Sequence, residues 1–439
     1  MSSNFVASLR SAAPYVHAHN QRVFVLAFGG EAADLPDFDK LIYDLALLQS
    51  LGVKLVLVHG ARPQIDRALR QAGQVPRVEQ GLRVTDRAAL QCVKAAVGAL
   101  RMEIEAKLST SLASTPMGGA RIRVAGGNWV LAQPVGVRGG VDFQHTGEIR
   151  RVDADAIRRE LDADRIALVS PVGYSPTGEI FNLRSEYLAT AVATAIGADK
   201  LIFITSSDPD GWKLADDTGD AGQLSLADAE RLLAEARVDA ADRGYLEAAL
   251  AAARSGVRRV HLLGAQTDGA LLRELYTRDG VGLMLYADAG YDEAVRAATI
   301  DDVGGLLALI KPLEAAGVLV PRSREQLELE IGQFFVMARD GMVIACAALI
   351  TFPDSRMGEF ACVAVHADYQ GSGRAATLLA YAEAQALKLG LSSLFALTTH
   401  TPHWFVEHGF VAGAVEDLPD ERQRFYNWQR NSLVLIKPL

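Results

Sequence analysis

The residues best suited to chemistry form a glycine-rich segment in the last third of the chain, between a predicted strand and a predicted helix. The segment consists of Gln370, Gly371, Ser372, Gly373, Arg374 and Ala375, and apolar residues at helical spacing follow it. Glycines at a helix start let the backbone approach a ligand closely and direct several N–H groups toward one point, where the helix dipole adds partial positive charge. The pattern predicts an anion site suited to a pyrophosphate, with an ordinary helix-capping turn as the alternative.

Two basic clusters in the same part of the chain are candidate contacts for an acidic ligand. Arg322 and Arg324 lie in a predicted turn, and Arg430-Asn431-Ser432 precedes the last predicted strand. An arginine fork matches the geometry of a carboxylate. We therefore expect a carboxylate-bearing ligand here, although an arginine taken alone more often belongs to a solvated surface.

Apolar periodicity places these residues in the second of two predicted domains. In the first, from Arg22 to about Ala287, short β-branched runs alternate with helical patterns, which predicts parallel strands joined by crossovers. The expected result is a three-layer α/β/α domain with ligand loops at the carboxyl ends of its strands. The predicted strands are Val23–Phe28, Lys54–Val58, Arg165–Ser170, Lys200–Thr205 and Arg259–Leu263, and the predicted helices include Phe38–Leu51 and Pro63–Ala72.

The alternation of predicted strands and helices ends near Tyr286–Glu293. Beyond this point we expect an α+β domain with mostly antiparallel strands. Its predicted strands are Phe334–Arg339, Met342–Phe352, Glu359–His366, Ser393–Thr398 and Leu433–Ile436, with helices at Ile300–Ala315 and Gly373–Leu389 and a hairpin turn at Asp340-Gly341. We predict an N-terminal helix over 1–20 that contacts another subunit, a first domain over 21–290 and a second over 291–439.

Composition narrows the classes of partner. The 439 residues include 44 Lys+Arg and 53 Asp+Glu, so the formal net charge is −9, which disfavours nucleic acid and anionic membranes as main partners. The cysteines Cys92, Cys346 and Cys362 are too few and too far apart for a disulfide framework or a zinc site, and no metal is expected. No signal-peptide pattern and no apolar run near ~20 residues occurs, so the expected location is the cytoplasm.

The glycine-rich segment and its surroundings resemble the acetyl-CoA-binding core of the GNAT acetyltransferases. Gln370, Gly373 and Ala375 occupy the specified positions of that family's Gln/Arg-x-x-Gly-x-Gly/Ala motif, and Trp404–Phe410 is similar to its closing element. The resemblance implies that the amides of the glycine-rich segment hold the pyrophosphate of acetyl-CoA. It also implies that strand backbone binds the pantetheine arm, at Cys362, Val363, Ala364 and Val365.

Within that resemblance, acetyl transfer to an amine requires a positioned amine, a base and stabilisation of the oxyanion. Glu359, at the start of the cofactor strand, is the candidate base, acting directly or through water. Thr398, at the end of the next strand, is the candidate acid for the departing thiolate. The alternatives are a solvated carboxylate at a strand end and an ordinary β-branched strand residue. A covalent route through Cys362 is disfavoured because no histidine is close to it in sequence.

The first domain resembles the amino-acid kinase family, specifically the N-acetylglutamate kinases. The matching pieces are Phe28-Gly29-Gly30, Val56–Gly60, Gly81–Asp86 and Gly197–Thr205. Active members begin with Lys-x-Gly-Gly, where this chain has Ala27. Their phosphate loop is His-Gly-Gly-Gly-Pro, where this chain has Ala61 and Arg62, and no lysine occurs between Leu214 and Ile310. Because phosphoryl transfer depends on positioned positive charge, we expect no kinase activity.

Resemblance to the arginine-inhibited kinases of that family implies an effector site for L-arginine between the N-terminal helix and the last helix and strand of the domain. The residues at its positions are Tyr15, His261, Glu274 and Gly280. Glu274 is placed to accept a guanidinium. The alternatives are a solvated helix carboxylate for Glu274 and a satisfied core histidine for His261.

Together the two resemblances cover nearly the whole chain. A chain with these two domains in this order resembles the family of fused bacterial N-acetylglutamate synthases. That family implies acetyl transfer from acetyl-CoA to L-glutamate as the first step of arginine biosynthesis, feedback inhibition by L-arginine, a hexamer, and glutamate contacts from Arg322, Arg430 and Ser432. Thr398 and Leu433 replace its usual serine and lysine. The alternatives are an acetylglutamate kinase fused to an unrelated acetyltransferase, and an arginine-sensing acetyltransferase with another acceptor.

Overall fold

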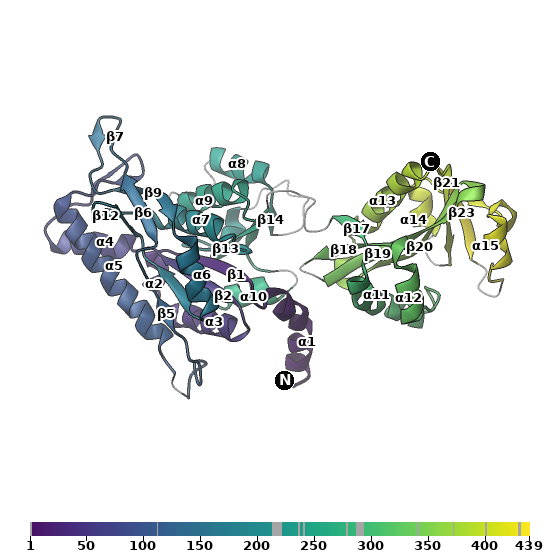
Figure 1. The fold of residues 1–439 in the computed structure, drawn as a ribbon, viewed down its shortest axis with the longest axis horizontal. Coiled ribbons are helices and arrows are strands. Elements are labelled where there is room, and N and C mark those ends of the chain that lie inside the picture. The colour runs from purple at the N-terminus through teal and green to yellow at the C-terminus, as the bar shows by residue number, and fades with distance from the viewer. Residues whose placement is uncertain are drawn as a thin grey trace. The chain divides into compact units, whose positions relative to one another are not determined.

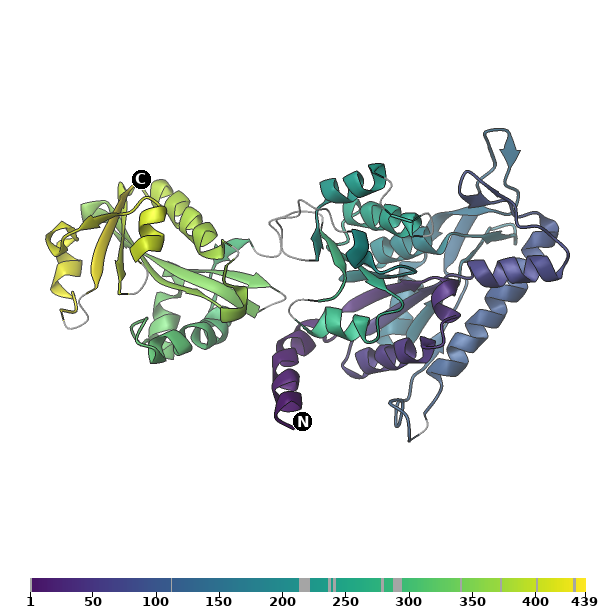
Figure 2. The same ribbon diagram turned by 180° about the vertical axis from the view of Figure 1, so that it is seen from behind.

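The computed structural model describes residues 2–111, 113–212, 222–235, 238–239, 242–277, 280–286, 294–339, 342–371, 373–399, 402–428 and 432–439. The chain forms two compact units, Met1–Ala289 and Gly290–Leu439. Each unit has a central sheet with hydrophobic cores of its own (Figures 1 and 2).

The first unit is built on an eight-stranded sheet in the order β14-β16-β15-β13-β1-β2-β10-β5. All of its pairings are parallel except β15 with β16, so the predicted parallel sheet is confirmed apart from that one pairing. The strands are β1 (Val23–Phe28), β2 (Lys54–His59), β5 (Val124–Ala125), β10 (Ile166–Val169), β13 (Lys200–Thr205), β14 (Gln223–Leu224), β15 (Arg259–Gly264) and β16 (Leu283–Tyr286).

Helices cover both faces of this sheet, because successive strand residues point to opposite sides. In β1, Val25 and Ala27 pack into one core, and Phe24, Leu26 and Phe28 pack into the other. The first core is covered by α6 (Ala154–Asp162), α7 (Ser185–Ile196), α8 (Leu226–Ala234) and α9 (Arg243–Arg254). The second is covered by α1 (Ser2–His19), α2 (Gly30–Ala33), α3 (Phe38–Ser50), α4 (Arg62–Gln71), α5 (Arg87–Leu108) and α10 (Ala270–Tyr276). The expected three-layer α/β/α architecture is therefore confirmed.

A second, smaller sheet was not anticipated from the sequence. Its order is β12-β11-β6-β9, and two short hairpins, β3–β4 and β7–β8, accompany it. The strands are β3 (Val78–Glu79), β4 (Leu82–Arg83), β6 (Val130–Pro134), β7 (Val137–Arg138), β8 (Val141–Asp142), β9 (Gly147–Val152), β11 (Val172–Tyr174) and β12 (Ile180–Asn182). Most of these strands are too short to give a clear two-residue period.

The second unit contains a seven-stranded sheet in the order β17-β18-β19-β20-β21-β23-β22. Every pairing is antiparallel except β20 with β21, as expected for an α+β domain. The strands are β17 (Val295–Ala297), β18 (Phe334–Arg339), β19 (Met342–Phe352), β20 (Met357–Val365), β21 (Ser393–Thr398), β22 (Val411–Gly413) and β23 (Leu433–Pro438). The turn predicted at Asp340-Gly341 lies outside the described residues, but β18 and β19 pair as a hairpin up to Arg339 and Met342.

Helices again occupy both faces of the second sheet. One core includes residues of α13 (Arg374–Lys388) and α14 (Pro402–Glu407), and the opposite core includes residues of α11 (Val303–Ala315) and α12 (Arg324–Glu330). A further short helix, α15 (Asp420–Arg424), precedes the last strand. Among the described residues, no helix combines the length and apolar character needed to cross a lipid bilayer.

Two leucines on α3 provide a test of this layering. Leu45 is fully buried, whereas Leu47 is 45% exposed. Leu45→Ala should lower the free energy of unfolding by about 2–5 kcal/mol, because it removes packed methyl groups and leaves a cavity. Leu47→Ala makes the same chemical change on the same helix and should cost well under half as much. Urea denaturation followed by circular dichroism measures both, and equal losses would contradict the assigned face of α3.

Candidate functional site

The glycine-rich segment leads into the first turn of α13, as its spacing predicted. Gly373 is the N-cap of this helix, with φ +74°, and Gly371 has φ +88°. Both values lie in the left-handed region that glycine adopts without strain. Among the described residues, no side chain caps this helix end, so the N–H groups of its first turn are left for a ligand. A Cβ on Gly373 would meet nothing within 4 Å, so the space beside the turn is open.

Two polar side chains of the segment, those of Gln370 and Arg374, hold the loop in shape. Gln370 Nε2 donates to the carbonyl oxygen of Val365 at 3.1 Å. Arg374 is 5% exposed and its Nη1 donates to the carbonyl oxygen of Tyr369 at 3.0 Å. Ala375 is half-buried behind the turn, and Ser372 lies outside the described residues. Because Gln370 and Arg374 are engaged in the loop, backbone N–H groups are the candidate anion contacts among the described residues of the segment.

Strands β20 and β21 separate beside this turn. They pair through Met357–Glu359 and Ser393–Phe395 only, although β20 continues to Val365 and β21 to Thr398. A register shift between β19 and β20 lies beside this separation, and Cys362 adopts φ +53° there, which is uncommon for a residue other than glycine. The β20 edge that faces β21 is thus unpaired with it from Phe360 to Val365. This edge includes the predicted pantetheine contacts Cys362, Val363, Ala364 and Val365 and offers backbone hydrogen bonds to an extended ligand.

Glu359 lies at the point where the two strands separate, and its side chain is only 7% exposed. Arg422 of α15 holds both of its carboxylate oxygens, with Nε to Oε2 at 2.7 Å and Nη2 to Oε1 at 3.0 Å. The alternative of a solvated carboxylate at a strand end is therefore wrong. Arg422 was not predicted as a site residue, since it lies 63 positions from Glu359 in a short, highly charged helix that is typical of a solvated surface.

Arg322 reaches the same strand. Its Nη1 lies 3.5 Å from Cys362 Sγ, and its backbone N–H donates to Glu314. Burial raises the pKa of the Cys362 thiol, against the opposing charge of Arg322, so the thiol stays protonated near neutral pH. Arg324 does not join this group, because its side chain is exposed and pairs with Glu328 one turn later in α12.

Two further predicted site residues, Thr398 and Ser432, lie on the far side of the separation. Thr398 ends β21 and pairs with Leu433 of β23. Ser432 is half-buried, and its carbonyl oxygen accepts a 2.6 Å hydrogen bond from the hydroxyl of Tyr426. Arg430 lies outside the described residues. The structure therefore brings Glu359 and Arg322 to β20, and Thr398 and Ser432 to the neighbouring strands.

Three of the four predicted effector residues meet in the first unit. His261 Nδ1 lies 2.7 Å from Glu274 Oε1, and both side chains are almost fully buried. The backbone N–H groups of Val281 and Gly282 donate to Glu274 Oε2 at 2.8 and 3.0 Å. A Cβ on Gly280 would lie 2.5 Å from the same oxygen, and its φ is +60°. Glu274 is thus a buried, hydrogen-bonded carboxylate, so its solvated alternative is wrong.

The charges of this cluster follow from its hydrogen bonds. Burial raises the pKa of Glu274, but the hydrogen bond from His261 and those from the two backbone N–H groups outweigh it, and the pKa falls to about 2. Burial and the charge of Lys200 lower the pKa of His261, so the imidazole is neutral near pH 7. Nδ1 then carries the proton toward Glu274, and Nε2 faces Lys200 Nζ at 3.5 Å. Lys200, which begins a buried strand, was not recognised as part of this cluster.

The N-terminal helix approaches this cluster through His19. His19 Nε2 lies 2.9 Å from the carbonyl oxygen of Leu275, which directly follows Glu274. Its ring lies 5.6 Å from that of Tyr276 and 6.5 Å from that of Tyr15. Tyr15, the fourth predicted effector residue, packs against the core that includes Leu275 and Tyr276. Helix α1 and helix α10 are therefore connected next to Glu274.

Comparison with known proteins relates both units to families. Residues 22–264 match the amino acid kinase family, and residues 308–410 match the acetyltransferase (GNAT) family. The amino-acid acetyltransferase of Azotobacter vinelandii is 50% identical over 99% of this chain and 100% of its own length. That of Escherichia fergusonii is 46% identical over 100% of this chain and 99% of its own.

A solved structure shows the same architecture. N-acetylglutamate synthase from Neisseria gonorrhoeae, complexed with coenzyme A and L-arginine, is 37% identical with a TM-score of 0.85, and the match covers 99% of both chains. The chain is about half identical to amino-acid acetyltransferases over almost its full length, and it contains an amino acid kinase domain followed by a GNAT domain. This chain therefore belongs to the amino-acid acetyltransferases.

Proposed function

We propose that this chain transfers the acetyl group of acetyl-CoA to the amino group of L-glutamate, giving N-acetyl-L-glutamate and CoA, and that L-arginine inhibits the reaction through the kinase-like unit. The observation that carries the proposal is the combination, in one unit, of an uncapped helix start beside two separating strands and a buried carboxylate at the point of separation. The N-acetylglutamate synthase from Neisseria gonorrhoeae with both CoA and L-arginine supports the choice of ligands.

The chain's own residues account for each step. The N–H groups at the start of α13 hold the pyrophosphate, and the free edge of β20 holds the pantetheine arm, so the thioester points toward Glu359. The amine nitrogen of glutamate forms a bond to the thioester carbonyl carbon and loses a proton to Glu359. The carbon–sulfur bond then breaks, and the thiolate receives a proton from Thr398 or from solvent. Arg422 fixes the orientation of the base.

Recognition of glutamate relies on arginine. Arg322 lies beside Cys362, which follows Glu359 by three residues on β20. The Arg322 side chain is 19% exposed, so its guanidinium combines low solvation with access to a ligand. Arg430 and Ser432, which precede β23 in the sequence, supply the second group of contacts to glutamate. Two carboxylates on the acceptor match two separate basic positions, which favours glutamate over a neutral or basic amine.

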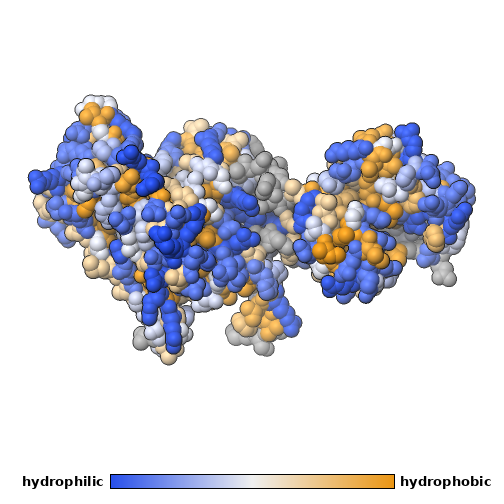
Figure 3. All heavy atoms as spheres, in the orientation of Figure 1, coloured by the Kyte–Doolittle hydropathy of each residue, from blue (hydrophilic) through white to orange (hydrophobic). Residues whose placement is uncertain are grey.

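Helix α1 is proposed to contact another subunit, in the hexamer implied by the resemblance. Phe5 and Leu9 on this helix are 67% and 60% exposed. Figure 3 shows apolar atoms gathered on α1. Exposed apolar residues in such a group are typical of an association surface.

An acceptor screen tests the proposed reaction. The full chain is incubated with acetyl-CoA and one candidate acceptor, and CoA release is followed by thiol titration, with and without L-arginine. Glutamate should exceed aspartate, lysine and peptides by a wide margin, and L-arginine should slow the reaction. A flat acceptor profile would remove glutamate as the substrate.

Glu359→Gln tests the base. The amide keeps the shape of the side chain but accepts no proton, so kcat should fall by about 100-fold or more while the Kd of acetyl-CoA stays near its wild-type value. Glu383→Gln is the control, because Glu383 is also a partly buried carboxylate in an ion pair, with Lys437, in the same unit. Unchanged turnover in Glu359→Gln would assign proton removal to another group.

Two glycines of one helix test the pyrophosphate cradle. Gly373 and Gly390 flank α13, both have φ +74°, and in neither case would a Cβ meet anything within 4 Å. Valine at either position should therefore cost similar stability. Only Gly373→Val should also weaken acetyl-CoA binding, by about tenfold or more, because it changes the turn that aims the N–H groups. Calorimetric titration measures this, and equal affinities in the two variants would place the pyrophosphate elsewhere.

Glu274→Gln tests the effector site. Loss of the charge removes one partner of a guanidinium, so half-inhibition should require at least about tenfold more L-arginine, with activity retained in its absence. Glu230→Ala, which removes an exposed carboxylate in the same unit, should leave the inhibition curve in place. Full sensitivity of Glu274→Gln would move the effector to another site.

A further inference from the structure

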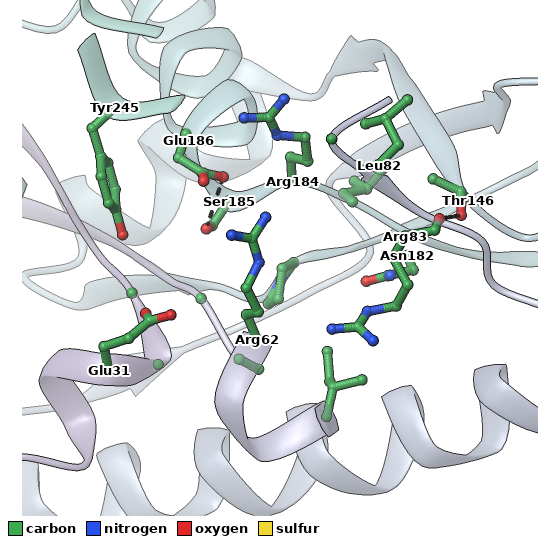
Figure 4. A pocket seen from close by; sticks show the side chains of 18 of the residues that line it. Glu31, Arg62, Leu82, Arg83, Thr146, Asn182, Arg184, Ser185, Glu186 and Tyr245 are labelled. Carbon is green, nitrogen blue, oxygen red and sulfur yellow. Dashed lines mark hydrogen bonds between the residues drawn. The ribbon is translucent and has the colours of Figure 1, made fainter. Parts of the chain in front are cut away.

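A pocket in the first unit lies between the start of α3 and the loop that joins β15 to α10. Its empty volume, open mouth included, is about 910 Å³. None of the described residues that line it also lines the pocket shown in Figure 4, where the kinase-like segments around Gly30 and Arg62 meet. None of them is a predicted effector residue either. This pocket is therefore separate from the groups that the proposed reaction and its inhibition use.

Apolar side chains form much of the pocket wall. They come from the segment before α3, from α3 itself, from β13 and from α10, and they include Leu35, Pro36, Phe38, Leu41, Ile204 and Leu271. Phe38, Ile204 and Leu271 are buried and belong to one core of the unit, so packing fixes their positions. A wall of this kind favours a ligand with a hydrocarbon part, because contact removes apolar surface from water.

Asp44 is a charged group of this pocket without a partner. It is half-buried, and within the described part of the chain no hydrogen bond or ion pair reaches its carboxylate. Burial raises the pKa of Asp44 to about 6, and the charge of Asp268 adds to the rise. The carboxylate is thus mostly ionised at pH 7. A half-buried charge that lacks compensation costs free energy, which a cationic ligand would recover.

The lysine that lines the pocket is engaged with other carboxylates. Lys40 Nζ lies 3.2 Å from Asp37 Oδ2 and 3.4 Å from Asp268 Oδ2, so it connects α3 to the loop before α10. Asp44 follows Lys40 by one helical turn, but no ion pair joins the two among the described residues. Three aspartates against one lysine give the described lining a formal charge of −2.

The combination of charge and apolar wall decides among ligand classes. An anion would be repelled by Asp44 and Asp268. A neutral apolar molecule would cover the carboxylate without compensating its charge. A metal ion needs several protein ligands, and within the described ranges no three His, Cys, Asp or Glu side chains are grouped to hold one. An organic cation satisfies both the carboxylate and the wall.

We infer that this pocket binds an organic monocation, a primary ammonium or guanidinium on an apolar stem, with the cation against Asp44 and the stem along Ile204 and Leu271. The inference does not rest on the proposed acetyl transfer. Leu271 lies in the first turn of α10, and Glu274 follows it by three positions, with its carboxylate held by His261. The inferred site and the candidate effector site therefore lie at different parts of one short helix.

Isothermal titration of the full chain with n-hexylammonium tests the inference, and n-hexanol is the neutral probe with the same stem. The ammonium should bind at least about tenfold more tightly than the alcohol. Asp44→Asn should reduce the affinity for the ammonium to that for the alcohol and leave the affinity for the alcohol near its wild-type value. Asp39→Asn is the matched control on the same helix, because Asp39 pairs with Lys107 outside the pocket, and it should bind both probes like the wild type.

Two further measurements complete the test. Asparagine keeps the shape of the side chain and removes an uncompensated charge, so the circular dichroism spectrum of Asp44→Asn should match that of the wild type. Glu274→Gln should retain the binding of n-hexylammonium, which separates this site from the effector site. Equal affinities of the wild type for the two probes overturn the inference, and so does an affinity for the ammonium that is unchanged in Asp44→Asn or lost in Glu274→Gln.

Discussion

The separation of β20 from β21 is the constraint on which the candidate acetyl-transfer site depends. The two strands pair for three residues each and then part, so polar backbone groups that a continuous sheet would satisfy are left for a ligand. The register shift against β19 and the positive φ of Cys362 lie along the same stretch of β20. Glu359 is the last residue of the paired part and Gly373 begins the helix beyond it, so the proposed base and the proposed anion cradle are positioned by one feature of the backbone.

Side-chain contacts between different elements further position the groups of both candidate sites. Arg422 clamps both oxygens of Glu359, and Arg322 lies against Cys362, so α15 and the start of α12 both connect to β20. In the first unit, Glu274 is tied to His261 and to two backbone N–H groups next to the helix that contacts His19. Glu359 and Glu274 are thus buried carboxylates whose partners come from several elements, which makes them sensitive to small movements of those elements.

Local pattern predicted most of the fold and part of the site. The strands around Val25 and Phe395 were predicted because buried central strands are short apolar runs, and the cradle was predicted because glycine at a helix start has a specific backbone use. The small sheet of β6, β9, β11 and β12 was not, since its strands are short and partly exposed. Arg422 and Lys200 were missed because a side-chain contact between distant segments leaves no periodic pattern in the sequence. Arg324 was grouped with Arg322 by proximity in sequence, but one turn of helix directs it to Glu328.

The buried thiol of Cys362 bears on how the acetyl group can travel. Two sulfur atoms would meet on β20, one from the chain and one from the bound thioester, and only the second is a good leaving group. Because burial keeps the protein sulfur protonated beneath Arg322, it offers no competing acyl carrier. An acyl-enzyme at Cys362 is therefore disfavoured, which supports the proposed direct attack of the amine in a ternary complex of enzyme, acetyl-CoA and glutamate over a ping-pong exchange.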